Sequence, residues 1–293
     1  MNETVVEIRN LSRSFGSKQA LADVSLSVAR GAVFGLVGEN GAGKTTLIKH
    51  LLGLLRAQQG SVRVFGLDPV ADPPGVLSRI GYLSEDRDLP DWMSVEELVN
   101  FTQAFFPQWD KRLAAELLAT FELDPRQNVK SLSRGQRARA GLLVALAHRP
   151  KLLVLDEPSS GLDPIVRRDI LAAIIRTVAD EGRTVLFSSH LLDEVERVAD
   201  QVTMLHAGQL VLSQPLDDLL GTHRRVTLRF AEPQPAGFTL PGALSCTGES
   251  RDWTCLCNGQ LELLKQAAVA RGGQVVEEAS PSLDEVFVAR VKG

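Results

Sequence analysis

Apolar and polar positions follow two different patterns over the first two thirds of the chain. The apolar runs 32–38, 151–158 and 183–190 are short, and each ends in small or polar residues. Such continuous runs are typical of strands that helices cover on both faces. In residues 23–31, valine and leucine alternate with serine, as in a strand with one buried face. The pattern predicts alternating strands and helices, an α/β domain with a largely parallel sheet.

Two further regions are predicted from a change of pattern. Seven of the chain's fifteen aromatic residues lie between Gly81 and Phe121, which indicates a helical insert at about residues 86–148. The large domain is expected to occupy residues 1–220. Residues 221–293 combine strand-like runs, a loop rich in proline and glycine, and one helical stripe. They are predicted to form a small C-terminal α+β domain.

Composition excludes several classes of protein. The 32 basic and 36 acidic residues give a net charge of −4, which provides no overall electrostatic footprint for nucleic acid. No apolar run approaches the roughly 18 residues that span a bilayer, so we expect a cytoplasmic chain. Alternation places Trp253, Cys255 and Cys257 on one strand face. We interpret the cysteines as packing residues, with metal binding or redox chemistry as the alternative.

The segment "GENGAGKTT", residues 38–46, directly follows one apolar run and opens a helical segment. This is the context of a Walker A motif, in which backbone amides surround the β-phosphate of a nucleotide. We expect its three glycines to keep that path clear and the helix to add its positive end. Lys44 is predicted to reach the β- and γ-phosphates, and the Thr45 hydroxyl to bind Mg²⁺. The alternative is a glycine-rich turn with an incidental lysine.

Polar residues at the ends of the other two apolar runs are predicted to meet this loop, because ligands collect at the carboxyl ends of parallel strands. Asp156 can hold Mg²⁺ through its water shell, and Glu157 can orient or deprotonate the attacking water. His190 is expected to hydrogen-bond to developing charge on the γ-phosphate. The alternatives are a solvated loop start for the carboxylate pair and an ordinary polar role for the histidine.

Four motifs stand in one order along the chain: "GENGAGKT", "LSRGQ", "LLVLDEP" followed by "GLD", and "SSH". Together they resemble the ATPase subunits of ABC transporters, over about residues 5–220. The motif "LSRGQ" distinguishes this family from other P-loop proteins. The resemblance implies a P-loop NTPase fold, an ABC-ATPase domain with a helical insert, with ATP and Mg²⁺ as cofactors.

In that family the "LSRGQ" motif binds ATP that the opposite subunit holds. Ser133 stands where a helix N-cap belongs, and Gly135 allows the backbone to approach an anion. The resemblance therefore implies a dimer, of identical or related subunits, that encloses two ATP molecules, with Asp163 at the seam. The family commonly has glycine at the position of Arg134. Its side chain either contacts phosphate or the facing subunit, or is solvated.

The resemblance extends to individual site residues. It implies ATP contacts from Phe15, Gly38, Glu39, Asn40, Gly41, Ala42, Gly43, Lys44, Thr45, Thr46, Ser133, Gly135, Gln136 and Asp163. It implies catalytic roles for Lys44, Glu157 and His190, and Mg²⁺ ligands among Thr45, Glu85 and Asp156. Phe15 either stacks on adenine or is a core phenylalanine. The family usually has glutamine at Glu85, which is either a site residue or a surface carboxylate.

The run "FFPQWDKRL" and the tail "SPSLDEVFVARV" are similar to bacterial ABC ATPases that work with separately encoded membrane proteins, commonly as exporters. We therefore expect a peripheral location on the inner face of the cell membrane. The aromatic residues from Trp92 to Trp109 either dock a membrane subunit or form the core of the insert. For the C-terminal domain, a regulatory or dimer-stabilising role stands against simple packing.

A transport ATPase explains all four motifs, with MgATP closing the dimer and hydrolysis opening it. A soluble ABC ATPase that acts on ribosomes or nucleic acid is the alternative, although its usual second cassette, coiled-coil insertion or zinc-binding cysteines are absent from this sequence. A small-molecule kinase would leave "LSRGQ" unexplained.

Overall fold

The computed structural model describes residues 3–179 and 182–292, which divide into two compact units. The first is Met1–Ser213 and the second Gln214–Gly293. The division falls inside strand β9 (Gln209–Pro215), and the expected boundary at residues 220 and 221 lies inside helix α8 (Leu216–Thr222). No helix in the described part of the chain is long and apolar enough to cross a membrane.

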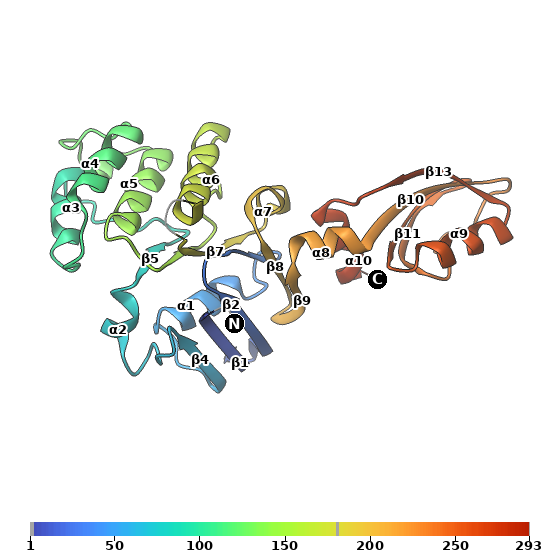
Figure 1. The fold of residues 1–293 in the computed structure, drawn as a ribbon, viewed down its shortest axis with the longest axis horizontal. Coiled ribbons are helices and arrows are strands. Elements are labelled where there is room, and N and C mark those ends of the chain that lie inside the picture. The colour runs from blue at the N-terminus through green and yellow to red at the C-terminus, as the bar shows by residue number, and fades with distance from the viewer. Residues whose placement is uncertain (1–2, 180–181, 293) are drawn as a thin grey trace. The chain divides into compact units, whose positions relative to one another are not determined.

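A six-stranded sheet forms the centre of the first unit (Figure 1). Its order is β5 (Ile80–Leu83), β6 (Leu152–Leu155), β7 (Thr184–Ser189), β3 (Val33–Val37), β8 (Gln201–His206) and β9. The neighbours from β5 to β8 pair in parallel. Every residue of β3, β6 and β7 is buried, so other elements cover both faces of these strands. The predicted α/β fold with a largely parallel sheet is confirmed.

A three-stranded antiparallel sheet packs against this centre. It is ordered β2 (Lys18–Ala29), β1 (Thr4–Phe15) and β4 (Gln59–Val64). The alternation predicted for residues 23–31 is present, since Val24, Leu26 and Val28 are buried. These side chains share a core with the first helix, α1 (Lys44–Leu51). That core fixes the beginning of α1, where the chain leaves β3.

Helices surround the central sheet. They are α2 (Pro73–Leu77), α3 (Val95–Gln103), α4 (Lys111–Thr120), the 3₁₀ turn η1 (Val129–Ser131), α5 (Arg134–Leu146), α6 (Pro164–Ala179) and α7 (Leu192–Val198). Helices α3, α4 and α5 form the helical insert, and α5 contacts both of the others and α6 (Figure 1). The side chains of Ser94, Asp110 and Ser133 cap these three helices.

The second unit is a four-stranded antiparallel sheet with helices. Its strands lie in the order β11 (Ala243–Glu249), β12 (Asp252–Asn258), β10 (His223–Phe230) and β13 (Gly273–Ala279). Helices α9 (Leu261–Ala270) and α10 (Leu283–Lys292) complete the α+β arrangement. Phe230, Phe238 and Trp253 pack edge to face in its core.

The cysteines of this second unit correct the sequence-based interpretation. Cys246 and Cys255 lie opposite each other on β11 and β12 and form a disulfide. Cys257 is a buried free thiol in the same core. The interpretation of the cysteines as packing residues therefore holds in full only for Cys257. The alternation of Trp253, Cys255 and Cys257 identified their shared buried face. It contained no signal for the partner, because Cys246 lies on a different strand.

Candidate active site

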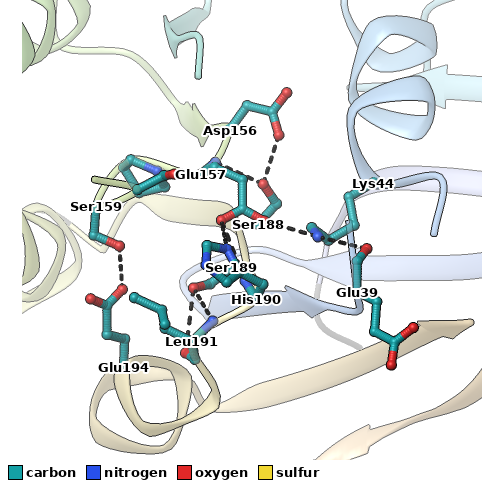
Figure 2. Close-up of polar contacts among 12 residues, drawn as sticks. Glu39, Lys44, Asp156, Glu157, Ser159, Ser188, Ser189, His190, Leu191 and Glu194 are labelled. Carbon is teal, nitrogen blue, oxygen red and sulfur yellow. Dashed lines mark hydrogen bonds and ion pairs between the residues drawn. The ribbon is translucent and has the colours of Figure 1, made fainter. Parts of the chain in front are cut away.

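Three strand ends bring the predicted site residues together. Because β6, β7 and β3 are parallel neighbours, their carboxyl ends share one edge of the sheet. The chain continues there into Gly38 after β3, Asp156 and Glu157 after β6, and His190 after β7. Figure 2 shows Lys44, Asp156, Glu157 and His190 meeting at this edge. The position is the one expected for a ligand site of an open α/β sheet.

Two carbonyl groups of the loop at residues 38–43, those of Gly38 and Glu39, bind the Lys44 side chain. The Lys44 ammonium donates to the carbonyl of Gly38 at 2.6 Å and to that of Glu39 at 3.2 Å. Only 5% of this residue is exposed. A buried ammonium is stable only with such partners, so the loop holds the charge in a fixed position. Helix α1 begins at Lys44 itself, so the loop leads directly into the amino-terminal end of the helix.

The glycines of this loop are required by the chain's own backbone. A Cβ at Gly38 would lie 2.3 Å from the carbonyl oxygen of Leu205, and one at Gly43 would lie 2.6 Å from that of Ala20. At Gly41 a Cβ would meet open space, but φ is +83°. The sequence-based reason, a clear path for phosphate, is therefore incomplete for Gly38 and Gly43. Contacts with β8 and β2 already exclude larger residues there.

Glu157 lies between two basic side chains. Its Oε1 is 2.9 Å from the Lys44 ammonium nitrogen, and its Oε2 is 2.7 Å from Nδ1 of His190. Glu157 and Lys44 are both buried, so little solvent screens their attraction. The backbone at Glu157 has φ +46°, an uncommon conformation for a residue with a side chain. In this backbone conformation the carboxylate reaches both Lys44 and His190.

Asp156 lies beside Glu157 but has different partners. The hydroxyl of Ser188 donates to Asp156 Oδ1 at 2.7 Å and accepts the amide of Glu157 at 2.8 Å. Asp156 also has a side-chain hydrogen bond with Thr45. Burial raises the pKa of the Asp156 carboxyl above its ordinary value, and these hydroxyls oppose that rise. Ser188 thus ties the Asp156 carboxylate to the backbone at Glu157.

A cavity of about 340 Å³ opens over the loop. It is lined by Phe15, Lys18, Ala20, Asn40, Gly41, Gly43, Lys44, Thr45, Thr46, Glu85 and Glu157. Glu39, Ala42 and His190 do not line it, although Glu39 and Ala42 belong to the loop and His190 contacts Glu157. The cavity is within the size range of small-molecule sites. It joins the glycine-rich loop to residues from three other parts of the chain.

Phe15 and Glu85 lie at the edge of this cavity. Phe15 is 46% exposed, which excludes the alternative of a core phenylalanine. The guanidinium of Arg13 lies 4.8 Å from its ring centroid, a cation–π contact. Glu85 is exposed and faces the cavity rather than a remote surface. Adenine stacking on Phe15 and metal binding by Glu85 stay predictions.

The sequence-based prediction missed Ala20 on the cavity wall and two polar residues, Lys18 and Ser188. Lys18 pairs with Phe15 across a tight turn and adds a positive charge to the cavity. A signal existed, because Gly16 stands directly after Phe15 and is typical of a turn. Ser188 connects Asp156 and Glu157. The polar end of its apolar run indicated a residue at the edge, but not which partners it would have.

The residues of the "LSRGQ" motif lie outside this cavity. Ser133 is the N-cap of α5, as predicted: its hydroxyl accepts the amide of Gln136 at 3.2 Å, and Gln136 Oε1 accepts the amide of Ser133 at 3.0 Å. This is a capping box. A Cβ at Gly135 would lie 2.8 Å from Val166 of α6. Gly135 therefore also permits close packing of α5 on α6.

Asp163 and Arg134 have partners within their own chain. The Asp163 carboxylate accepts the amides of Ile165 and Val166 at 3.0 and 3.1 Å and so caps α6. These bonds lower its pKa. The Arg134 guanidinium lies against the backbone of Gly161. Neither sequence-based interpretation of Arg134 included this contact.

Comparisons with known proteins agree with this geometry. Residues 21–160 match the family model described as "ABC transporter". The chain is 30% identical over 289 residues to the ABC transporter ATP-binding protein YtrB of Bacillus subtilis, covering 99% of each chain. This chain belongs to the ABC transporter ATP-binding proteins. As an ABC ATPase it binds nucleotide and hydrolyses ATP.

The chain is also similar to a second relative and to a solved structure. The daunorubicin resistance ATP-binding protein DrrA3 of Streptomyces coeruleorubidus is 32% identical over 307 residues, covering 98% of this chain and 96% of that protein. A solved structure of the ATP-binding subunit of an ABC transporter matches with a TM-score of 0.68 at 28% identity. It covers 73% of this chain and 91% of that one. The P-loop ABC-ATPase fold is therefore confirmed.

Proposed function

We propose that this ABC ATPase forms a dimer around two MgATP molecules and drives export of a substrate through separate membrane subunits. The observation that carries the proposal is the position of Glu157. Its carboxylate lies between the side chains of Lys44 and His190. Glu157 also lines the cavity, at the sheet edge where the glycine-rich loop begins. A buried carboxylate in this position is suited to act on a water molecule beside the γ-phosphate.

Lys44, Glu157 and His190 have different roles in hydrolysis. Lys44 contributes a fixed positive charge to the β- and γ-phosphates. Glu157 accepts a proton from water as the water oxygen bonds to the γ-phosphorus and the bond to the β–γ bridging oxygen breaks, releasing ADP and phosphate. His190 contacts Oε2 of Glu157 and so fixes the orientation of the carboxylate. Charge on the phosphate is then stabilised by groups already in place.

The donor set fits Mg²⁺. Thr45 and Asp156 place a hydroxyl and a carboxylate together, and Mg²⁺ is commonly held by one or two carboxylates together with substrate phosphates. Glu85 supplies a further carboxylate on the cavity wall. When bound, the ion would neutralise phosphate charge. Thr45, Asp156 and Glu85 would hold it, while Lys44 and Glu157 keep their own roles.

The position of the "LSRGQ" motif outside the cavity supports a dimer. Ser133, Gly135 and Gln136 do not line their own chain's nucleotide cavity, yet the amide groups at the beginning of α5 form an anion-binding end. A second subunit would bring this end to the exposed phosphates, with Asp163 at the seam. The two chains would enclose one ATP at each of two sites.

An apolar groove of about 330 Å³ supports docking to a membrane subunit. It is lined by Leu52, Leu54, Leu77, Ile80, Tyr82, Thr102, Phe106, Val144, Ala145 and His148. Other aromatic side chains of the insert are highly exposed, with Trp92 at 77% and Phe105 at 64%. Exposed aromatic groups of this size are typical of protein interfaces. This favours the docking interpretation of the aromatic residues over a packed core and would place the subunit at the inner face of the membrane.

Export is supported by the daunorubicin resistance relative, whose name describes protection from a drug. The test is purification of this chain from detergent-solubilised membranes of a host that expresses it with its neighbouring genes. We expect an integral membrane protein to be recovered with it, and its ATPase activity to support outward movement of that transporter's substrate. Recovery only with ribosomes or nucleic acid would contradict the proposal.

A further inference from the structure

The loop at residues 158–163 connects Glu157 to the beginning of α6, and a buried arginine holds it from one side. The Arg87 guanidinium donates through Nη2 to the carbonyl of Pro158 at 3.1 Å and to that of Ser160 at 2.9 Å. Arg87 is 3% exposed, so these carbonyls are its substitute for water. A charged donor that binds two carbonyls fixes the path between them.

Arg134 covers the next residue of the same loop. A Cβ added at Gly161 would lie 2.3 Å from Nη1 of Arg134 and 2.5 Å from its Cζ. Gly161 also has φ +64°, a conformation that favours glycine. The guanidinium therefore occupies the space where a side chain at position 161 would begin.

The two arginines come from different parts of the first unit. Arg87 follows β5 and stands two residues after Glu85, which lines the nucleotide cavity. Arg134 is the first residue of α5, within the "LSRGQ" motif. The loop's other contacts lead elsewhere: Ser159 donates to Glu194 of α7, and Arg167 of α6 donates to the Leu162 carbonyl. Arg87 and Arg134 thus tie the loop to the Glu85 segment and to α5.

We propose that Arg87 and Arg134 form an arginine clamp on residues 158–163. The clamp sets the position of this loop, and with it the positions of Glu157 at one end and Asp163 at the other. Movement of the Glu85 segment or of α5 is passed to the loop through these side chains. Both are positioning residues, since neither lines the cavity. The link to hydrolysis rests on the proposed function; the clamp on the loop does not.

Amide hydrogen exchange without nucleotide tests the clamp directly. The amides of Ser160 and Leu162 are bonded to the carbonyls of Glu157 and Ser159, so they report the order of the loop. In Arg87→Gln we expect these amides to exchange about tenfold faster, because two charge-assisted hydrogen bonds are lost. Arg134→Gln should act in the same direction. Arg87→Lys should restore part of the protection, since a single ammonium retains the charge but not the planar fork.

A matched control is Arg112→Gln, because Arg112 is an 89% exposed side chain of α4 paired with Glu116. This variant should leave exchange in the loop unchanged. If exchange in Arg87→Gln and in Arg134→Gln equals that of Arg112→Gln, the clamp is refuted. Should Arg87→Gln fail to fold, the exposed Arg134 keeps the test decisive.

A double-variant cycle tests whether Arg134 acts through Gly161. Gly161→Ala introduces the Cβ that displaces the guanidinium. Arg134→Gln should therefore accelerate exchange less in the Gly161→Ala background than in the original protein. An equal effect in both backgrounds would show that Arg134 acts elsewhere.

Steady-state kinetics separate positioning from ATP binding. Arg134→Gln should lower kcat about tenfold, while monomer affinity for ATP stays unchanged because the arginine does not line the cavity. Reduced affinity with unchanged kcat would contradict a positioning role. Exchange is measured on the nucleotide-free chain, so failure to dimerise or to support transport would leave the exchange result intact and would refute only the proposed function.

Discussion

Nδ1 of His190 lies 2.7 Å from Oε2 of Glu157, so the histidine contacts the carboxylate that we propose as the base. The sequence placed His190 at the γ-phosphate, whereas its protein partner in this structure is Glu157. Lys44 faces the other oxygen of the same carboxylate at 2.9 Å. The orientation of Glu157 is therefore set by contacts within the protein and needs no bound phosphate.

Removal of the histidine should affect turnover far more than binding. His190→Ala frees one oxygen of Glu157, and we expect kcat to fall about 100-fold, the range for loss of a positioned catalytic group. ATP affinity should change little, because His190 does not line the cavity. Steady-state ATPase assays with equilibrium nucleotide binding check this. His206→Ala, on β8, is the control and should keep full activity.

The buried pair of Lys44 and Glu157 predicts a non-additive effect on stability. Lys44→Ala leaves Glu157 buried without its ammonium partner, and loss of one member of such a pair costs about 3–5 kcal/mol. Adding Glu157→Gln removes the buried charge that has lost its ammonium partner. Urea unfolding should therefore show the double variant to be more stable than Lys44→Ala alone. A double variant less stable than both single variants would contradict this relationship.

The glycines of the phosphate loop should differ in their effect on folding. Gly38→Ala and Gly43→Ala each place a Cβ within 2.6 Å of a backbone oxygen, and the structure must shift to accommodate it. Gly41→Ala creates no steric contact, and only the positive φ disfavours it, at a cost of about 1 kcal/mol of unfolding free energy. Unfolding free energies without nucleotide should rank Gly41→Ala as the mildest variant. Equal effects at the three positions would refute the assignment to Leu205 and Ala20.

Two matched helix caps separate stability from function. Ser133 and Ser94 both close a capping box, on α5 and α3. Replacement of either by alanine should cost about 1 kcal/mol of unfolding free energy. Only Ser133→Ala should also reduce ATP turnover, because we propose that the beginning of α5 contacts the partner's phosphate. The idea fails if both variants hydrolyse ATP at the same rate.

The sequence predicted those parts of the fold whose signal is local. The runs that became β3, β6 and β7 were recognised because both faces are buried, and the glycine-rich loop because its composition is unusual. Contacts between distant segments left no such signal. The Leu205 carbonyl that excludes a side chain at Gly38, and the place of Arg134 over Gly161, depend on tertiary packing. The disulfide between Cys246 and Cys255 depends on strand pairing in the same way.

The account rests on Glu157 as the base of an ATP-bound dimer, and Glu157→Gln tests it most directly. The amide keeps the size of the side chain but cannot accept the proton of water, so hydrolysis should fall at least about 1,000-fold while ATP binding persists. Size-exclusion chromatography with light scattering should then find a dimer in MgATP and a monomer without nucleotide. A variant that hydrolyses ATP near the original rate, or that stays monomeric in saturating MgATP, would contradict the account.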